Sequence, residues 1–228
     1  MASAVLGDWR DMKQIRHSQQ TGGFTLIELL VVIAVVAVLT TLLLPTLVRE
    51  KNKAQRIRCT SHLKQIGLSF KQWALDNTNS YPMTLSTNFG GTKEWIPVGG
   101  AFRHFVVVSN ELNTPFILTC PSDTARRAAQ TFNSTLSDSN VSYFVGVDAD
   151  DIKPQMFLAG DRNITNRLGL RSGLVAWTTN ELVAWTHQLH DQQGNVALAD
   201  GSVQGFSNSR LREALQNTGV ATNRLLMP

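Results

Sequence analysis

The sequence predicts an α+β fold in which a long N-terminal helix, its first half transmembrane, packs on a small antiparallel β-sheet head. The first observation is that residues 24–48 are almost entirely apolar and contain a single charged residue, Glu28. At about 1.5 Å per residue, such a helix crosses a hydrocarbon core of roughly 30 Å. The second is that apolar residues continue at helical spacing beyond it. The third is that the rest of the chain is polar and divided into short apolar runs.

The long helix is expected to continue to about residue 75. Beyond residue 48, apolar residues recur at steps of four, three, four and three, which places them on one face of a helix; these are Cys59, Leu63, Ile66, Phe70 and Trp73. The polar run 76–82 then ends the helix. Residues 49–76 are therefore predicted to be an amphipathic continuation of the helix, and residues 77–228 the globular head.

Short strands are predicted to dominate the head, at residues 105–108, 116–119, 141–147, 156–159, 174–177 and 182–185. Residues 195–206 predict a hairpin, because Asp200-Gly201 between alternating segments is typical of a type I′ turn. Residues 209–216 predict a short C-terminal helix that ends near Gly219.

The charge pattern argues against a nucleic-acid partner. The net charge is only +4, and the basic residues gather just beyond the apolar run, at Arg49, Lys51, Lys53, Arg56 and Arg58. Such a cluster is able to hold phosphates, but no basic and aromatic residues interleave as they do in nucleic-acid modules. A solvated helix face beside a membrane is the favoured interpretation, and no nucleic acid is expected.

The two cysteines, Cys59 and Cys120, are candidates for a disulfide. An even pair in an exported domain favours a bridge, whereas the same pair in a cytosolic protein favours two buried thiols. Their spacing does not decide between these alternatives.

The N-terminal 23 residues differ from an ordinary secretory signal. They are polar and basic, and the small residues Gly22 and Gly23 precede the apolar run instead of following it. This order predicts cleavage after Gly23 at the cytoplasmic face, so that residues 1–23 are a leader and the apolar helix stays on the mature protein.

One segment resembles the type IV prepilin cleavage and N-methylation motif: Gly23-Phe24-Thr25-Leu26-Ile27-Glu28. Pro45 lies where many pilins have a proline that kinks the helix. The resemblance implies a pilin-like fold, and a membrane prepilin peptidase that cuts after Gly23 and methylates the new amine of Phe24.

Glu28 needs a partner if its helix crosses a membrane. A carboxylate in an apolar helix costs about 2.5–3.5 kcal/mol at the bilayer centre, and no Lys or Arg lies within a turn of it. Cleavage would supply the amine of Phe24, and the resemblance implies that Glu28 pairs with a neighbouring N-terminus during assembly. The alternative is a carboxylate that reaches the headgroups.

The head resembles a bacterial subgroup of pilin-like proteins with an H-x9-DG signature, here His190 followed by Asp200-Gly201. Further pieces that carry this resemblance are the segments 58–68, 120–123 and 160–163. We interpret the signature as structural, with Asp200 forming the turn and His190 hydrogen-bonding near it. Members of this subgroup are generally assigned to type II secretion or described as pilin-like.

No cofactor is expected, apart from a weak indication of calcium. Major pseudopilins of type II secretion, which the N-terminus resembles, commonly bind calcium in a loop of the head. Asp148, Asp150 and Asp151 offer the oxygen ligands that calcium prefers. They lack a recognisable ligand spacing, so a solvated acidic turn is favoured.

The resemblance implies a non-enzymatic filament subunit that supports protein secretion. Its expected partners are prepilin peptidase, copies of itself, other pseudopilins, and the inner membrane with its assembly platform. The helix is expected to cross the inner membrane once, with the head in the periplasm and later in a filament outside the cytoplasm. The sequence does not distinguish a secretion pseudopilus from a surface pilus.

Two alternatives stay open, one for the topology and one for the function. The positive-inside rule compares Arg10, Lys13 and Arg16 with the five basic residues after residue 48 and, taken alone, favours a cytoplasmic head. The cleavage signal and the cysteine pair favour the opposite topology, which we adopt. The second alternative is a membrane-anchored exoplasmic binding protein or hydrolase that uses His190 and Asp200.

Overall fold

The computed structural model describes residues 23–166 and 168–228, so the predicted leader lies outside the described residues except for Gly23. The chain divides into two compact units, of which the second is Val48–Pro228. Helix α1 (Leu26–Asp76) contains the apolar run in its first half and enters the second unit in its second half. The predicted long helix is therefore confirmed, and its backbone is continuous through Pro45.

The second unit combines the second half of α1 with the globular head. Its further helices are α2 (Ala101–Val107), α3 (Ser109–Leu112) and α4 (Asn208–Asn217), with short 3-10 helices η1 (Thr87–Phe89), η2 (Lys93–Trp95), η3 (Pro115–Leu118) and η4 (Asp138–Asn140). Its strands are β1 (Tyr143–Gly146), β2 (Phe157–Asp161), β3 (Ile164–Thr165), β4 (Gly173–Thr178), β5 (Ala184–Trp185), β6 (Gln193–Leu198), β7 (Val203–Ser207) and β8 (Thr222–Met227). Six strands form an antiparallel sheet in the order β4-β8-β1-β2-β6-β7, and β3 pairs with β5. The predicted α+β class is confirmed.

The second half of α1 supplies one wall of the core, as its apolar stripe predicts. Cys59, Leu63, Ile66 and Phe70 are fully buried, and Trp73 is 7% exposed. Their helical spacing brings all five side chains to the same face, where they join residues of α2 and the sheet in one cluster. Beyond Asp76, positive φ angles at Thr78 and Asn79 turn the chain away from the helix.

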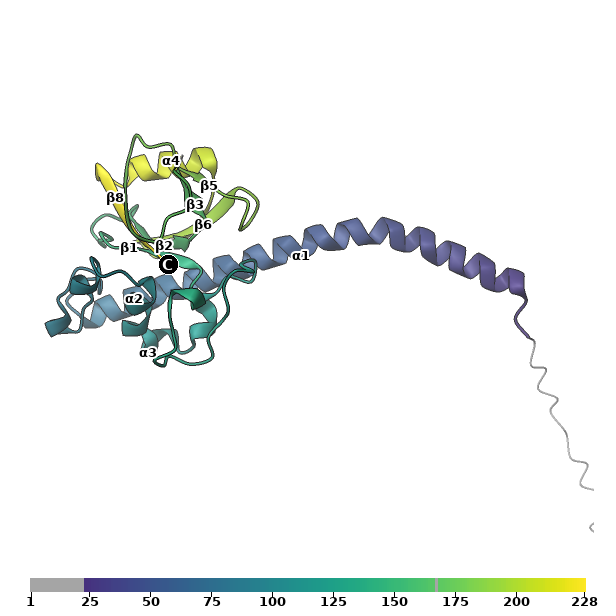
Figure 1. Cartoon of the computed structure of the whole chain (residues 1–228), viewed down its shortest axis with the longest axis horizontal. Coiled ribbons are helices and arrows are strands. Elements are labelled where there is room, and N and C mark those ends of the chain that lie inside the picture. Colours follow the sequence, from purple (N-terminus) through teal and green to yellow (C-terminus); the bar gives the residue numbers. More distant parts are fainter. Residues whose placement is uncertain (1–22, 167) are drawn as a thin grey trace, which may run out of the picture. The chain divides into compact units, whose positions relative to one another are not determined.

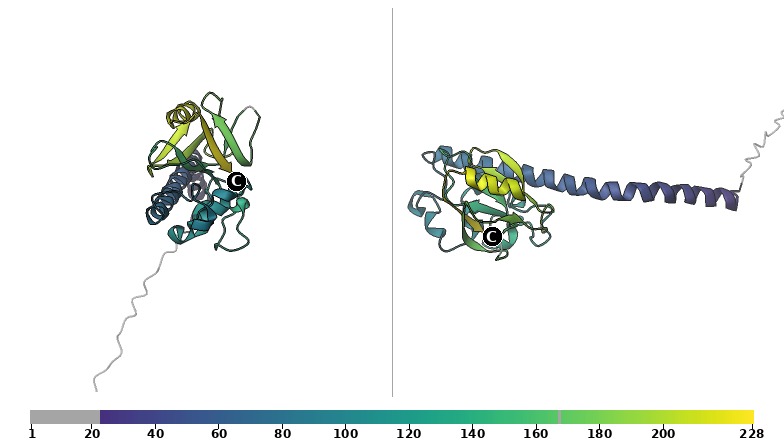
Figure 2. Two further views of the ribbon diagram at one scale, coloured as in Figure 1. Left: turned by 90° about the vertical axis from the view of Figure 1, so that its left-hand side faces the viewer. Right: turned by 90° about the horizontal axis from the view of Figure 1, so that it is seen from above.

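The sheet is covered on both faces, and consecutive residues of a strand enter different cores. Tyr143 and Val145 of β1 pack in the core with α1 and α2, whereas Phe144 packs in the core beneath α4. In β8, Leu226 faces α1 and Leu225 faces α4. Figures 1 and 2 show α4 on one side of the strands and the head portion of α1 on the other. Double coverage explains why β1 and β2 are buried at every position.

Several predicted strands differ from the structure. Residues 105–108 are not a strand, because they belong mainly to α2, and residues 116–119 lie mainly in the 3-10 helix η3. Short apolar runs of this kind carry no period that separates strand from helix. The runs at 141–147, 156–159 and 174–177 do contain β1, most of β2 and most of β4, whereas only the end of 182–185 forms β5.

The hairpin β6–β7 and the helix α4 are confirmed, but the predicted type I′ turn is wrong. Ala197 pairs with Val203, and the Gly201 amide donates to the Leu198 carbonyl at 2.9 Å. Positive φ occurs at Gly201 (81°) and not at Asp200. The connection is thus a type I turn followed by a left-handed glycine, the usual three-residue hairpin loop.

Candidate functional site

The first site is the start of α1, where the predicted processing residues lie. Thr25 immediately precedes the helix, and its amide and hydroxyl donate to Glu28 Oε2 at 2.8 and 2.7 Å. The Glu28 amide donates in return to Thr25 Oγ1 at 3.3 Å. This reciprocal pattern is a capping box, in which a Thr and the Glu three residues later satisfy free amides of the first turn. The Thr-x-x-Glu spacing is visible in the sequence, and we did not predict it.

Gly23 and Phe24 are exposed beside this cap, and Phe24 is 80% exposed. A methyl group built on Gly23 meets no atom within 4 Å. Packing within the described residues therefore gives no reason for a glycine at this position.

The apolar half of α1 leaves its side chains uncovered. An 18-residue window of the helix is long and apolar enough to cross a membrane, by length and composition alone, and none of that window is buried in the structure. Among the described residues, Glu28 makes no ion pair.

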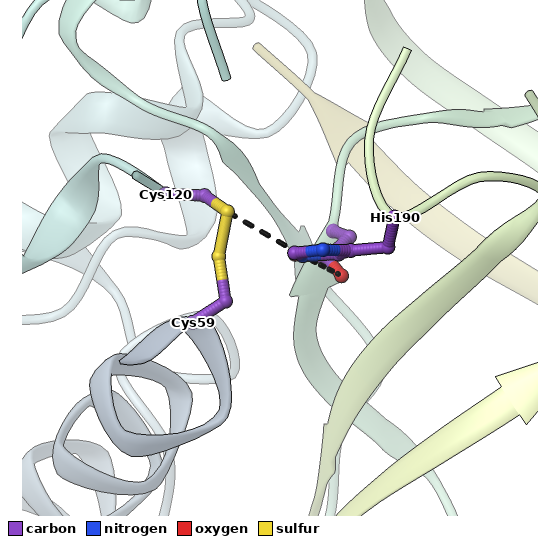
Figure 3. Close-up of side chains that lie close together, drawn as sticks. Cys59, Cys120 and His190 are labelled. Carbon is purple, nitrogen blue, oxygen red and sulfur yellow. Dashed lines mark hydrogen bonds and ion pairs between the residues drawn. A yellow bond between two sulfur atoms is a disulfide. The ribbon is translucent and has the colours of Figure 1, made fainter. Parts of the chain in front are cut away.

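The second site is a buried cluster in the head that brings together four segments distant in sequence. Its members are Cys59 on α1, Cys120 after η3, Asp161 at the end of β2 and His190 before β6. The sulfur atoms of Cys59 and Cys120 are bonded, with their Cα atoms 5.2 Å apart. His190 Nε2 lies 3.4 Å from Cys120 Sγ and 3.5 Å from Asp161 Oδ2. Figure 3 shows the imidazole of His190 directed at the sulfur pair.

Burial controls the protonation of this cluster. It raises the pKa of Asp161 to about 7, against the hydrogen bonds that Asn195 donates and the charge of Arg56. Burial, followed by the charge of Arg56, lowers the pKa of His190 to about 4. The imidazole is therefore neutral at neutral pH, and the contact with Asp161 is not an ordinary pair of opposite charges.

The loop that carries His190 has an unusual backbone. His190, Asp191 and Gln192 have φ angles of 51°, 49° and 58°. The left-handed region costs a non-glycine residue about 1–2 kcal/mol, so the surrounding contacts must hold this loop. Asn163 Nδ2 does so by donating to the carbonyl oxygens of Thr186 and Leu189 at 3.1 Å.

The segments that carry the resemblance to the H-x9-DG subgroup meet around this loop. Arg162, next to Asn163, donates through Nε and an Nη to the two carboxylate oxygens of Asp123 at 2.7 and 2.8 Å. Burial acts to raise the pKa of Asp123, but the bonds and charge of Arg162 outweigh it and lower that pKa. No role was predicted for Asp123, Asp161, Arg162 or Asn163, although each lies in a segment that carries the resemblance to the H-x9-DG subgroup.

The Asp200-Gly201 loop is held by α1 and by Tyr81, just after α1. Three successive loop carbonyls accept hydrogen bonds: Ala199 from Tyr81 Oη at 2.7 Å, Asp200 from Lys71 Nζ at 3.2 Å, and Gly201 from Lys64 Nζ at 2.7 Å. The Asp200 carboxylate accepts from the Ser202 amide at 2.8 Å.

His190 does not hydrogen-bond near Asp200, contrary to our prediction. The two residues flank opposite ends of β6, and at about 3.3 Å per residue a six-residue strand places its ends roughly 17 Å apart. This separation gives no support to a hydrolase that uses the two side chains together.

The aspartates considered for calcium face different partners. The carboxylate of Asp148 accepts from Arg224 Nε at 2.9 Å, and Asp151 pairs with Lys71 at 3.1 Å. Asp150 accepts from the Ile152 amide at 3.0 Å. Calcium at this loop stays a prediction.

The comparison with known proteins identifies the class of protein from the N-terminal segment. Residues 19–44 match the model of the prokaryotic N-terminal methylation motif. The N-terminal segment of the chain therefore carries the prepilin methylation motif, as the residues from Gly23 to Glu28 predict.

Within that class, the N-terminal third of the chain is distantly similar to core protein G of the type II secretion system. Identity is 40% over 62 residues with the protein of Pectobacterium carotovorum subsp. carotovorum, covering 27% of this chain and 39% of that protein. It is 39% over 66 residues with that of Klebsiella pneumoniae, covering 29% and 46%. It is 34% over 70 residues with that of Escherichia coli (strain K12), covering 31% and 48%. The chain thus spans less than half the length of these relatives, and no solved structure matches it.

The family has general properties that bear on both sites. Pilin-like proteins are typically non-enzymatic structural subunits. Proteins of the prepilin family are processed by a peptidase and assembled into a filament. The apolar helix after the motif is consistent with anchoring in the inner membrane before assembly.

Proposed function

We propose that the chain is a prepilin that is cut after Gly23, methylated at Phe24 and assembled as a structural subunit of a filament. The observation that carries the proposal is the order of its N-terminal features. The exposed Gly23-Phe24 bond comes first, followed by the Thr25–Glu28 cap and then by an apolar helix that the rest of the chain leaves uncovered.

The uncovered helix supports assembly as well as anchoring. Large apolar side chains along its first half, such as Leu29, Val36 and Leu43, are 58, 52 and 58% exposed. A bilayer covers such a surface before assembly, and the apolar helices of neighbouring subunits cover it afterwards. Association inside lipid gains little from the hydrophobic effect, so a polar group such as Glu28 has the larger part in selecting the register.

The proposed filament is a type II secretion pseudopilus, with prepilin peptidase, other pseudopilins and the assembly platform as partners. Similarity to core protein G over the N-terminal third supports this choice over a surface pilus. The head carries the difference between such filaments, and it lies largely beyond the matched region. Its role is to present the outer surface of the filament, without catalysis.

The proposed topology places the head in the periplasm. The bonded cysteine pair supports this location, because disulfides persist in oxidising compartments. A periplasmic head is opposite to the topology that the count of basic residues favours, and a reporter fusion can decide between the two. Alkaline phosphatase fused after Pro228 should be active. An inactive phosphatase fusion, together with fluorescence of a second fusion that carries green fluorescent protein at the same place, would contradict the periplasmic location.

The experiment that tests the proposal compares Gly23→Ala and Gly23→Val in a host that supplies a prepilin peptidase. Since a Cβ atom added to Gly23 meets no atom of the described residues within 4 Å, neither substitution should disturb the fold. We expect the valine variant to remain uncut and to be absent from sheared filaments, and the alanine variant to be processed at least in part. Filaments that form normally from uncut Gly23→Val protein would contradict the proposal.

A further inference from the structure

We propose that the reduced head binds one zinc ion through Cys59 Sγ, Cys120 Sγ, His190 Nε2 and a carboxylate oxygen of Asp161. Two thiolates, an imidazole and a carboxylate are a donor set that zinc takes in four-coordinate sites. All four donor atoms lie within 4.8 Å of one another. The site is independent of the processing and assembly proposed above.

The distances match a tetrahedral site. Zinc bonds of about 2.3 Å to sulfur and about 2.0–2.2 Å to nitrogen or oxygen place neighbouring ligand atoms roughly 3.3–3.8 Å apart. His190 Nε2 already lies 3.4 Å from Cys120 Sγ and 3.5 Å from Asp161 Oδ2. The main adjustment is separation of the two sulfur atoms, which reduction of their bond permits.

The donor side chains are buried, and neighbouring residues hydrogen-bond to them. The side chains of His190 and Asp161 are 2% and 0% exposed, and Asp161 Oδ1 has no hydrogen-bond partner within the described residues. Asp161 Oδ2 accepts from the amide and the side chain of Asn195 at 2.7 and 3.0 Å. The Tyr143 hydroxyl donates to Cys59 Sγ at 3.6 Å. Such outer contacts orient ligands and stabilise anionic donors.

The strained loop gives a second reason to assign a role to His190. Three consecutive positive φ angles turn its imidazole towards the sulfur atoms, and Asn163 holds the loop in place. Backbone strain of this kind concentrates at functional sites. His190 also lines a cavity of ≈ 540 Å³ together with Arg56 and Ser122, so one ligand of the cluster borders this cavity.

The disulfide and the metal are alternative states of one site. A phosphine reductant breaks the sulfur–sulfur bond by supplying two electrons, the two sulfur atoms take up two protons from water, and the phosphine becomes its oxide. Zinc then displaces both thiol protons and forms two zinc–sulfur bonds. A peroxide oxidant takes up the two electrons of the thiolates together with two protons and is reduced to water, which re-forms the disulfide and releases the ion.

The test is zinc binding by the full chain in detergent micelles, with and without a phosphine reductant. After removal of free metal, we expect about one zinc per reduced chain and almost none per oxidised chain. Cobalt in place of zinc should give the thiolate charge-transfer and ligand-field absorption of tetrahedral cobalt. Substoichiometric zinc on the reduced wild-type chain, or an octahedral cobalt spectrum, would overturn the proposal.

Matched variants locate the site. His190→Ala and the double variant Cys59→Ser/Cys120→Ser should each weaken zinc binding at least tenfold. His187→Ala is the control, because His187 lines the same cavity but is 71% exposed and pairs with Asp191. Equal affinity of His190→Ala and wild type would exclude His190 as a ligand. The wild-type cobalt spectrum remains decisive if a variant does not fold.

Discussion

The hydroxyl of Thr25 donates to the carboxylate of Glu28 at 2.7 Å, and the Glu28 amide donates back to Thr25 Oγ1 at 3.3 Å. In the uncut chain, the carboxylate that the prepilin resemblance assigns to assembly is therefore occupied at the start of its own helix. Cleavage after Gly23 creates an ammonium group one residue before Thr25. The same carboxylate then has a charged partner available on its own or a neighbouring subunit.

Glu28→Gln should separate processing from assembly. The amide can still accept from Thr25 and keep the cap, but it cannot form an ion pair with the amine of Phe24. We expect normal cleavage and at least a tenfold loss of filaments, equivalent to about 1.4 kcal/mol or more. Quantitative blotting of sheared filaments measures the loss. Glu50→Gln, which removes a carboxylate outside the apolar run of α1, should assemble normally, and equal losses in both variants would contradict the role of Glu28.

The Cys59–Cys120 bridge should contribute substantially to the stability of the head. It closes a sequence separation of 61 residues, for which the chain-entropy model gives about 4 kcal/mol. Chemical unfolding of Cys59→Ser/Cys120→Ser should therefore require less denaturant than unfolding of the oxidised wild type. A metal chelator should be present throughout, so that zinc does not stabilise any reduced wild-type chain. Identical midpoints in the two proteins would contradict this contribution.

The buried pair of Asp123 and Arg162 should be more important for stability than an exposed pair of the same type. Their side chains are 2% and 11% exposed, and loss of one partner from a buried pair costs about 3–5 kcal/mol. We expect Asp123→Asn to lower the unfolding free energy by that amount. Asp191→Asn, whose carboxylate is 91% exposed beside His187, should change it by less than about 0.5 kcal/mol. Similar effects of the two substitutions would argue against the assignment.

His104 should make the head less stable in mild acid. Burial, followed by the charge of Arg103, lowers the pKa of His104 to about 4, and Thr92 is hydrogen-bonded to its Nδ1 at 2.7 Å. The unfolded state takes up this proton first, so the stability contributed by the neutral imidazole is complete above about pH 6.5 and is lost as the pH falls towards 4. The loss amounts to about 3 kcal/mol.

Comparison with His104→Asn isolates this effect, because asparagine does not titrate and retains an acceptor for the Thr92 hydroxyl. Denaturant unfolding between pH 7 and pH 4 should show a smaller decrease in stability for the variant than for wild type. The lowered pKa of His190 acts in the same direction in both proteins, so only the difference between them reports His104. Parallel pH profiles would contradict the prediction.

The sequence predicts elements that have a long period or a specific turn, and it fails for short apolar runs. The stripe from Cys59 to Trp73 repeats over four helical turns, so its burial follows from spacing alone. Residues 105–108 combine an aromatic and β-branched residues, which favour a strand. Most of these residues instead form the end of helix α2, with Phe105 packed in the core, and no strand of the described residues pairs with them.

The buried cluster could be predicted only in part. The cysteines and His190 attract attention by residue type and by motif, but Asp161 is one of eleven aspartates in the chain. Its burial follows from the antiparallel pairing of Tyr143 with Asp161. No local pattern indicates that the end of β2 meets α1 and the strained loop before β6, because that meeting depends on the folded sheet.

The central claim is that the bond between Gly23 and Phe24 is cut. Its most direct test is the intact mass of the protein after co-expression with an active prepilin peptidase, followed by sequencing of the N-terminal peptide. We expect a chain that begins at Phe24 and carries one added methyl group on its amine, and an uncut chain with a catalytically inactive peptidase. A mature chain that begins at any other residue, or an unprocessed chain in the presence of active peptidase, would contradict the claim.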